Sequence, residues 1–142
     1  MYTKQGKPKT VIDTNIAVSA LIARRGFSAQ LFEKIILGEI QNFTSKEIIE
    51  EIEDVLKRKE ITKRTTKPSR DFILTNYLAK SIEVKPKTKV TIVEDKDDNK
   101  FIETALEAKA DYIVSGDHHL LELKEFRGIK IVKAKELLEL KL

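Results

Sequence analysis

The sequence predicts an α/β fold in which helices cover both faces of a central, mainly parallel sheet. Short runs of apolar and β-branched residues alternate along the chain with longer segments whose apolar residues recur at helical spacing. In addition, an aspartate ends two of the apolar runs, Asp13 and Asp117, where each run turns into a helix. Because the carboxyl ends of parallel strands share one edge of a sheet, we expect both aspartates at the edge where ligands bind.

Length and composition indicate a single domain. The chain has 142 residues, 41% of them hydrophobic and 35% charged, which suits one sizeable core. We expect the domain at residues 10–142, after a flexible basic arm at residues 1–9. The chain has no cysteine, which excludes disulfides and thiolate chemistry and suits a reducing cytoplasm. No apolar run approaches the ~18 residues of a membrane span, so we expect a cytoplasmic protein without membrane insertion.

The first half of the chain alternates strand and helix patterns. Its expected elements are a strand at 10–13, helices at about 16–25 and 28–38, a strand at 40–43 and a helix at 45–56. Thr14 or Asn15 can cap the first helix. Thr44 and Glu47 have the spacing of a capping box, which predicts that Thr44 caps the third helix.

The second half continues the alternation after a basic segment. Its expected elements are a helix from Pro68 or Ser69 to about 82, a short strand at 82–84, an extended stretch at 90–93, a helix to about 110, a strand at 110–115, a helix after Asp117, a strand at 129–132 and a helix at 134–140. Pro86 makes its surroundings irregular, since proline cannot donate to a central ladder.

The third helix carries several acids, and its periodicity separates them. At about 100° per residue, Glu50 and Asp54 face away from the apolar stripe, whereas Glu51 and Glu53 lie at its two borders. Glu51 is nearer the start of the helix and so nearer the carboxyl edge of the sheet. We therefore expect Glu51 to face the site, with Glu53 as the second choice and a boundary glutamate paired with a lysine as the alternative.

Two further acidic positions could join the same edge. Residues 94–100 are the most acidic stretch and open a helix, and more carboxylates gather there than helix capping explains. Asp98 stands at that helix start, and Asp117 repeats the arrangement around Asp13. His118 and His119 receive little weight as metal ligands, because neighbours on a helix point about 100° apart.

These carboxylates predict a site for a hard metal ion. Clustered carboxylates without cysteine favour Mg²⁺ or Mn²⁺ over Zn²⁺. Such ions activate water and polarise phosphoryl oxygens, and two of them about 3.5–4 Å apart can stabilise both the attacking and the leaving oxygen. We therefore expect Asp13, Glu51, Asp98 and Asp117 to hold one or two ions for phosphodiester hydrolysis, with RNA as the expected substrate.

A basic segment suggests the partner. Seven basic residues and one acid between Lys57 and Arg70 give this segment a charge of +6, whereas the whole chain carries +4. A local basic block suggests a polyanion, and a solvated lysine-rich linker is the alternative. The residues expected to grip the RNA backbone are Arg24, Arg25, Lys57, Arg58, Lys63 and Arg64.

Four stretches together resemble the PIN domain from residue 10 onwards. They are Val11-Ile12-Asp13-Thr14-Asn15, Ser45 with Glu51, Asp95 with Asp98 and Phe101, and Ala110 to Asp117. The resemblance is closest to prokaryotic VapC-like toxins of toxin–antitoxin systems. It implies a three-layer α/β/α sandwich and a Mg²⁺- or Mn²⁺-dependent endoribonuclease.

The resemblance also implies residue roles and partners. It assigns Asp13, Glu51, Asp98 and Asp117 as catalytic metal ligands, and the supporting roles fall to Asn15, Ser115 and Asp95. A homodimer and an antitoxin protein that blocks the active site are expected as well. Two alternatives remain open: a catalytically silent RNA-binding relative, and a Mg²⁺-binding receiver domain whose required lysine would be Lys133.

Overall fold

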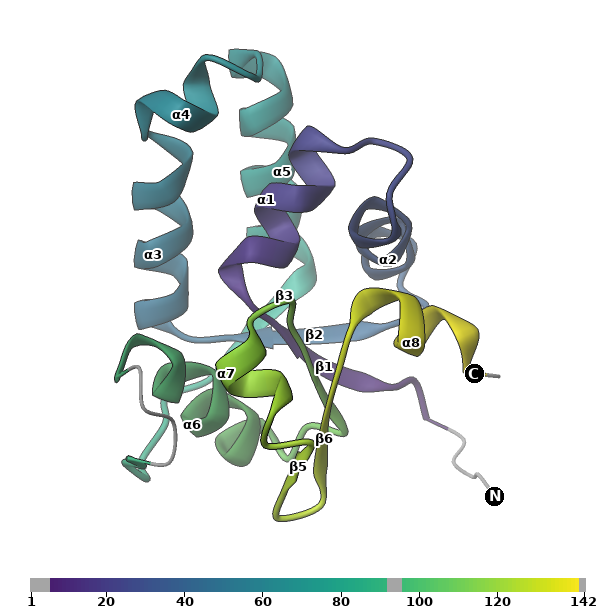
Figure 1. Cartoon of the computed structure of the whole chain (residues 1–142), viewed down its shortest axis with the longest axis vertical. Coiled ribbons are helices and arrows are strands. Elements are labelled where there is room, and N and C mark those ends of the chain that lie inside the picture. The colour runs from purple at the N-terminus through teal and green to yellow at the C-terminus, as the bar shows by residue number, and fades with distance from the viewer. Residues whose placement is uncertain (1–5, 92–95, 141–142) are drawn as a thin grey trace.

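The computed structural model describes residues 6–91 and 96–140, with the side chain of Lys96 excepted. It confirms the predicted fold class, because a mostly parallel sheet lies between helices (Figure 1). The extended stretch expected at 90–93 falls partly outside the described residues, and Asp95 lies outside them altogether.

Within the described residues the sheet has the order β3-β2-β1-β4-β6-β5. The strands are β1 (Lys9–Ile12), β2 (Gln41–Thr44), β3 (Ser81–Glu83), β4 (Tyr112–Val114), β5 (Glu125–Phe126) and β6 (Ile129–Val132). All neighbours pair in parallel except β5 with β6. Strand β5 was not predicted; Arg127 and Gly128, both with positive φ, turn the chain back into β6.

The helices follow the predicted alternation. They are α1 (Thr14–Ile22), α2 (Phe27–Ile36), α3 (Lys46–Leu56), α4 (Lys59–Thr62), α5 (Lys67–Lys80), the 3₁₀ helix η1 (Lys96–Asp98), α6 (Asn99–Ala108), α7 (His118–Leu121) and α8 (Ala134–Glu139). Helix α4 was not predicted, because a single turn is too short to show a period.

Helices cover the sheet on both faces. Helix α6 packs against β1, β2 and β4, whereas α1, α2 and α5 pack against one another on the opposite side (Figure 1). Helix α3 contacts α1 and α5 as well as α6, so it reaches past the edge of the sheet. The core between these layers is apolar, and Ile12, Leu31, Ile52 and Ile102 are fully buried.

Three predicted helix starts are corrected. Asp13, rather than Thr14 or Asn15, caps α1. The capping box expected at Thr44 and Glu47 is wrong, because Thr44 ends β2 and Ser45 is the N-cap of α3. Helix α5 begins before Pro68, since Thr66 and its partner three residues later form a capping box there. Asp13 and Thr66 cap with their side chains, whereas Ser45 makes no side-chain capping bond.

The strand order contradicts the receiver alternative. Receiver-type sheets have the order 2-1-3-4-5, in which the third strand lies beside the first. Here β3 lies beyond β2, and β4 takes the place beside β1. In the part of the chain that the structure describes, no helix is both long and apolar enough to span a membrane.

A buried tyrosine links α5 to the sheet. The hydroxyl of Tyr77, a residue 1% exposed, donates to the Thr44 hydroxyl at 2.6 Å. Tyr77→Phe should lower the free energy of unfolding by about 1 kcal/mol, because it leaves Thr44 without this donor. Urea denaturation followed by circular dichroism measures the loss, and an unchanged stability would contradict the assigned bond.

Candidate functional site

Two adjacent parallel strands, β1 and β4, end at one edge of the sheet. Their register pairs Ile12 with Val114, so Asp13 and Ser115 are neighbours just beyond the strands. The amide of Asp13 donates to the carbonyl of Val114 at 3.0 Å. The chain passes from β1 to β2 on one side and enters β4 on the other, so the strand order reverses here. Ligands of open α/β sheets bind at such a reversal.

Asp13 is buried at this edge, with 3% of its surface exposed. Its Oδ1 accepts a hydrogen bond from the amide of Ile16 at 3.0 Å, and the hydroxyl of Ser115 donates to Oδ2 at 2.5 Å. Burial raises the pKa of Asp13 from 3.8 to about 6, the charge of Asp117 adds to this rise, and the two hydrogen bonds oppose it. A cation at this edge would therefore favour the charged carboxylate.

Ser115 links Asp13 to Asp117. The Ser115 hydroxyl accepts from the amide of Asp117 at 2.9 Å while it donates to Asp13. Asp117 caps α7, because its Oδ1 accepts from the amide of His119 at 2.7 Å. The structure thus brings together three of the predicted residues, Asp13, Ser115 and Asp117, in one hydrogen-bonded chain.

Glu51 reaches the same region from α3. The hydroxyl of Thr14, the residue after Asp13, donates to Glu51 Oε2. The other oxygen, Oε1, lies 2.5 Å from the ammonium of Lys100 at the start of α6. Glu53, the second choice from periodicity, instead lines a separate groove with Lys57 and other residues of α3 and α5. The structure therefore brings Glu51, and not Glu53, into contact with Thr14, the residue that follows Asp13.

The remaining predicted residues differ in their placement. Asp98 lies just before α6 and is buried, with 8% of its surface exposed. Lys100, which contacts Glu51, follows two residues later on the first turn of α6, so the start of this helix lies close to α3. Asn15 lies on the first turn of α1 with an exposed side chain. Among residues 6–91 and 96–140, no contact supports a role for Asn15.

Among the described residues, the one group of three ligand-type side chains whose atoms lie within 4.8 Å of one another is Asp117, His118 and His119. The four predicted acids do not form so tight a group. The expectation that the two histidines point apart is wrong, since their ring centroids are 4.1 Å apart. Both rings lie at the start of α7, and His118 is exposed.

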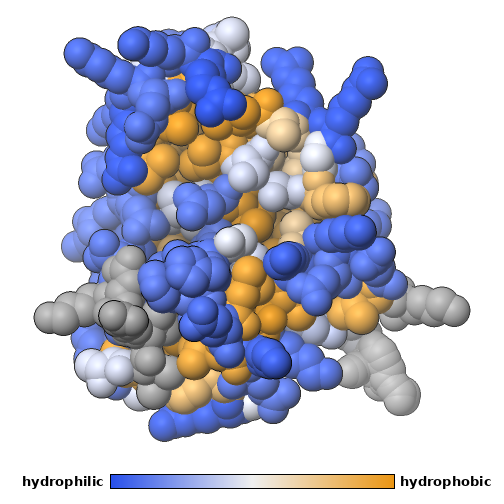
Figure 2. All heavy atoms as spheres, in the orientation of Figure 1, coloured by the Kyte–Doolittle hydropathy of each residue, from blue (hydrophilic) through white to orange (hydrophobic). Residues whose placement is uncertain are grey.

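Four of the predicted basic residues lie at the ends of two helices, α3 and α4, rather than in a long linker. Lys57 ends α3, Arg58, Lys63 and Arg64 flank α4, and all four are exposed. Figure 2 shows that hydrophilic side chains cover the end of the molecule that carries α4. Lys57 is six residues beyond Glu51, about 9 Å along the helix axis. The basic segment is thus within reach of a substrate that binds at Glu51.

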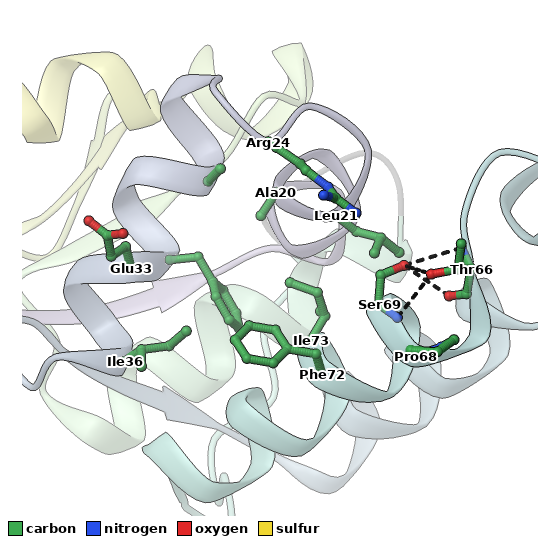
Figure 3. A pocket seen from close by; sticks show the side chains of 12 residues that line it. Ala20, Leu21, Arg24, Glu33, Ile36, Thr66, Pro68, Ser69, Phe72 and Ile73 are labelled. Atoms are coloured by element: carbon green, nitrogen blue, oxygen red, sulfur yellow. Dashed lines mark hydrogen bonds between the residues drawn. The ribbon is translucent and has the colours of Figure 1, made fainter.

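We call the sheet edge with Asp13, Ser115 and Asp117, together with the nearby Glu51 and Asp98, the acidic edge. Arg24 and Arg25 follow the end of α1, away from this edge. Arg24 lines a groove of about 510 Å³ between α1, α2 and α5, in which Phe72, Ile73 and other apolar side chains gather (Figure 3). The groove lies at the far end of α1 from its N-cap, Asp13. This groove is therefore distinct from the acidic edge.

Sequence reasoning missed Thr14 and Lys100. Thr14 was considered only as a helix cap, and Lys100 only as part of an acidic stretch. Both contacts join residues far apart in the chain, Thr14 with Glu51 and Lys100 with Glu51. No local pattern identifies such pairs. The one local hint in the sequence for Lys100 is its place two residues after Asp98, at the start of a helix.

The donor set fits a hard divalent ion. Asp13, Glu51, Asp98 and Asp117 offer carboxylate oxygens, which Mg²⁺ and Mn²⁺ prefer. Asp117 is close enough to Asp13 that its charge raises the pKa of Asp13. A cation between these carboxylates would offset both the repulsion and the desolvation of Asp13.

Comparison with known proteins gives two findings. A family model described as PIN domain matches residues 9–119, which contain every residue of the acidic edge. The chain is also 37% identical over 120 residues to the uncharacterized protein MJ1680 of Methanocaldococcus jannaschii. That alignment covers 84% of this chain and 77% of the relative.

Proposed function

The chain belongs to the PIN domain family, and we propose on this basis that it is a metal-dependent endoribonuclease whose active site is the acidic edge beside β1 and β4. PIN domains are generally nucleases that use divalent metal ions. The observation that carries the assignment to this edge is Asp13, a buried carboxylate with a raised pKa that lies close to the charge of Asp117. A buried carboxyl group with perturbed acidity at a ligand-binding edge is typical of a functional site.

The proposed ligands are Asp13, Glu51, Asp98 and Asp117. When bound, Mg²⁺ or Mn²⁺ activates water and polarises the scissile phosphate. The hydroxyl of Ser115 holds Asp13, and the hydroxyl of Thr14 holds Glu51, so both carboxylates are oriented before substrate arrives. Asn15 and Asp95 remain proposed supporting residues on the resemblance alone.

RNA is the proposed substrate. The basic residues around α4 lie on the helix that carries Glu51 and on its continuation, so they can hold the phosphate backbone on one side of the site. Such contacts are salt-dependent and carry little sequence information. Arg24 and Arg25 are weaker candidates, because they lie at the far end of α1 from Asp13.

We extend the proposal to a narrower role, the toxin of a toxin–antitoxin pair, which the resemblance to VapC-like proteins supports. This role includes a homodimer, a cytoplasmic location and an antitoxin protein that covers the acidic edge. The alternative within the family is a protein that binds RNA without cutting it.

A matched pair of variants on α3 tests the assignment. Glu51→Gln should reduce Mn²⁺-dependent RNA cleavage by at least about 10²-fold, the cost of removing one electrostatic group from a reacting centre. Glu53→Gln, which makes the same change two residues away, should cut at close to the wild-type rate. Equal activity in the two variants, at wild-type level or at a reduced level, would remove Glu51 from the proposed site.

A further inference from the structure

Lys100 is a largely buried cation that pairs with Glu51, one of the proposed metal ligands. Its side chain is 12% exposed, and its ammonium lies 2.5 Å from Glu51 Oε1. The same ammonium lies 5.3 Å from the ring centroid of Phe101, a contact that adds a cation–π interaction. Surface lysines are seldom held so closely, because a long flexible side chain loses entropy when it is fixed. A packed lysine that pairs with a proposed metal ligand therefore calls for a specific role.

The two helices that bring Lys100 and Glu51 together are fixed to each other. The hydroxyls of Thr104 on α6 and Ser45, the N-cap of α3, are 2.9 Å apart in a buried position. Thr104 also donates to the carbonyl of Lys100 at 2.8 Å. The ion pair is therefore set by the packing of α3 on α6 rather than by a chance side-chain conformation.

Both oxygens of Glu51 already have a donor. Thr14 donates to Oε2, and Lys100 contacts Oε1. Both oxygens of Asp13 also accept hydrogen bonds, but from the neutral donors Ile16 and Ser115. Glu51 differs because one of its donors is an ammonium, whose positive charge repels a divalent ion. Lys100 already supplies part of the positive charge that a second metal ion would bring to the site.

We propose that Lys100 is a positioning residue that limits the acidic edge to one divalent ion, with its ammonium in place of a second. This inference rests on the proposed metal-dependent function. In this narrower form of the proposal, Asp13, Asp98 and Asp117 would be the direct ligands of the single ion, and Glu51 would contribute its charge without direct coordination. Lys100 would hold Glu51 at the rim of the site and keep it against Thr14.

The test counts bound Mn²⁺ by calorimetric titration and by the electron paramagnetic resonance signal of free Mn²⁺. The wild-type protein should bind one ion per chain. Lys100→Met should bind two ions, because the competing charge is gone and Glu51 becomes available. The affinity of this variant for the second ion should be at least roughly tenfold higher than that of the wild type. Lys100→Arg keeps the charge and should again bind one.

A lysine outside the edge serves as the matched control. Lys130 is exposed on β6 and pairs in register with Tyr112, the first residue of β4, so it lies toward the opposite edge of the sheet. Lys130→Met changes the net charge as Lys100→Met does and should still bind one ion. Circular dichroism confirms that each variant is folded, and the wild-type count stands even where one variant fails to fold.

Separate readouts distinguish this inference from the proposed function. Two ions in the wild type, an unchanged count in folded Lys100→Met, or no bound Mn²⁺ in any protein would overturn the inference. If the wild type cuts RNA yet binds two ions, the nuclease proposal stands and the role of Lys100 is refuted. If the count changes from one to two but no protein cuts RNA, the role of Lys100 is supported and the nuclease proposal fails.

Discussion

Asp13→Asn should abolish metal-dependent RNA cleavage, with a loss of at least about 10²-fold in rate. The amide keeps the shape of the side chain and can still accept the hydrogen bond from Ile16 that caps α1. It removes the negative charge that Ser115 links to Asp117 in the proposed site. The variant thus separates the charge of Asp13 from its capping role.

Single-turnover cleavage of a labelled RNA with saturating Mn²⁺ measures this loss. Circular dichroism and the elution volume on size exclusion should match those of the wild type, because the N-cap bond is retained. Full activity in a folded Asp13→Asn variant would place the chemistry elsewhere. Loss of activity together with loss of structure would be uninformative about the charge, and Asp13→Ser, which also caps helices, then serves as the second variant.

The second large effect is a pH dependence of stability in the metal-free protein. The folded pKa of Asp13 is about 6, whereas an aspartate in an unfolded chain titrates near its ordinary 3.8. The folded state therefore binds the proton more tightly, and the stability that this carboxyl group contributes is fully present below about pH 4. It is lost as the pH rises through about 6.

The expected size follows from the two pKa values. A tenfold difference in proton affinity corresponds to about 1.4 kcal/mol, so the loss from Asp13 is about 3 kcal/mol between about pH 4 and pH 7. Asparagine does not titrate, so the stability of Asp13→Asn relative to the wild type should rise by about 3 kcal/mol over this range.

Urea unfolding at several pH values in the presence of a chelator measures this difference. Comparison of the two proteins at each pH cancels the titration of every other group that they share. A difference in stability that does not depend on pH would contradict the raised pKa. Repeating the series with saturating Mn²⁺ should reverse the trend, because a bound cation stabilises the charged carboxylate of the wild type.

Asp13 is expected to oppose stability and activity to each other. Asp13 is expected to cost the metal-free protein stability at neutral pH and to be required for activity. Substitutions that stabilise a protein by relieving an unfavourable active-site charge commonly impair its function. A variant that is both more stable and inactive would identify Asp13 as a functional residue rather than a structural one.

Much of the fold follows from local patterns in the sequence. The β-branched run at Val11 and Ile12 and the run at Ile113 and Val114 gave β1 and β4, because buried parallel strands are continuously apolar. The alternation of such runs with helical periods gave the parallel sheet. The order of the strands was not predictable in the same way, since it depends on how helices of several lengths pack.

The elements that were missed are short or are decided by distant contacts. Helix α4 and strand β5 are each too short to show a period. Thr44 matches a helix cap in the sequence, yet the hydroxyl of Tyr77, 33 residues further on, donates to its side chain in β2. Here a tertiary hydrogen bond takes precedence over a local capping pattern.

The candidate site was predictable in its positions but not in its connections. Asp13, Asp117 and the inward face of Glu51 follow from strand ends and helix periodicity. The contacts of Glu51 with Thr14 and Lys100 join three separate elements, and only the packed structure brings them together. The charge balance of the site, and with it the proposed number of metal ions, therefore required the structure.

Cleavage of RNA by the purified wild-type protein after removal and return of metal tests the central proposal most directly. The substrate is a pool of single-stranded and structured RNAs, and the protein is first stripped with chelator and then titrated with Mn²⁺ or Mg²⁺. We predict no cutting in chelator and internal cleavage that returns with the metal, and none with the Asp13→Asn variant. Cutting that persists in chelator, or that Asp13→Asn retains, would contradict a metal-dependent ribonuclease at this edge.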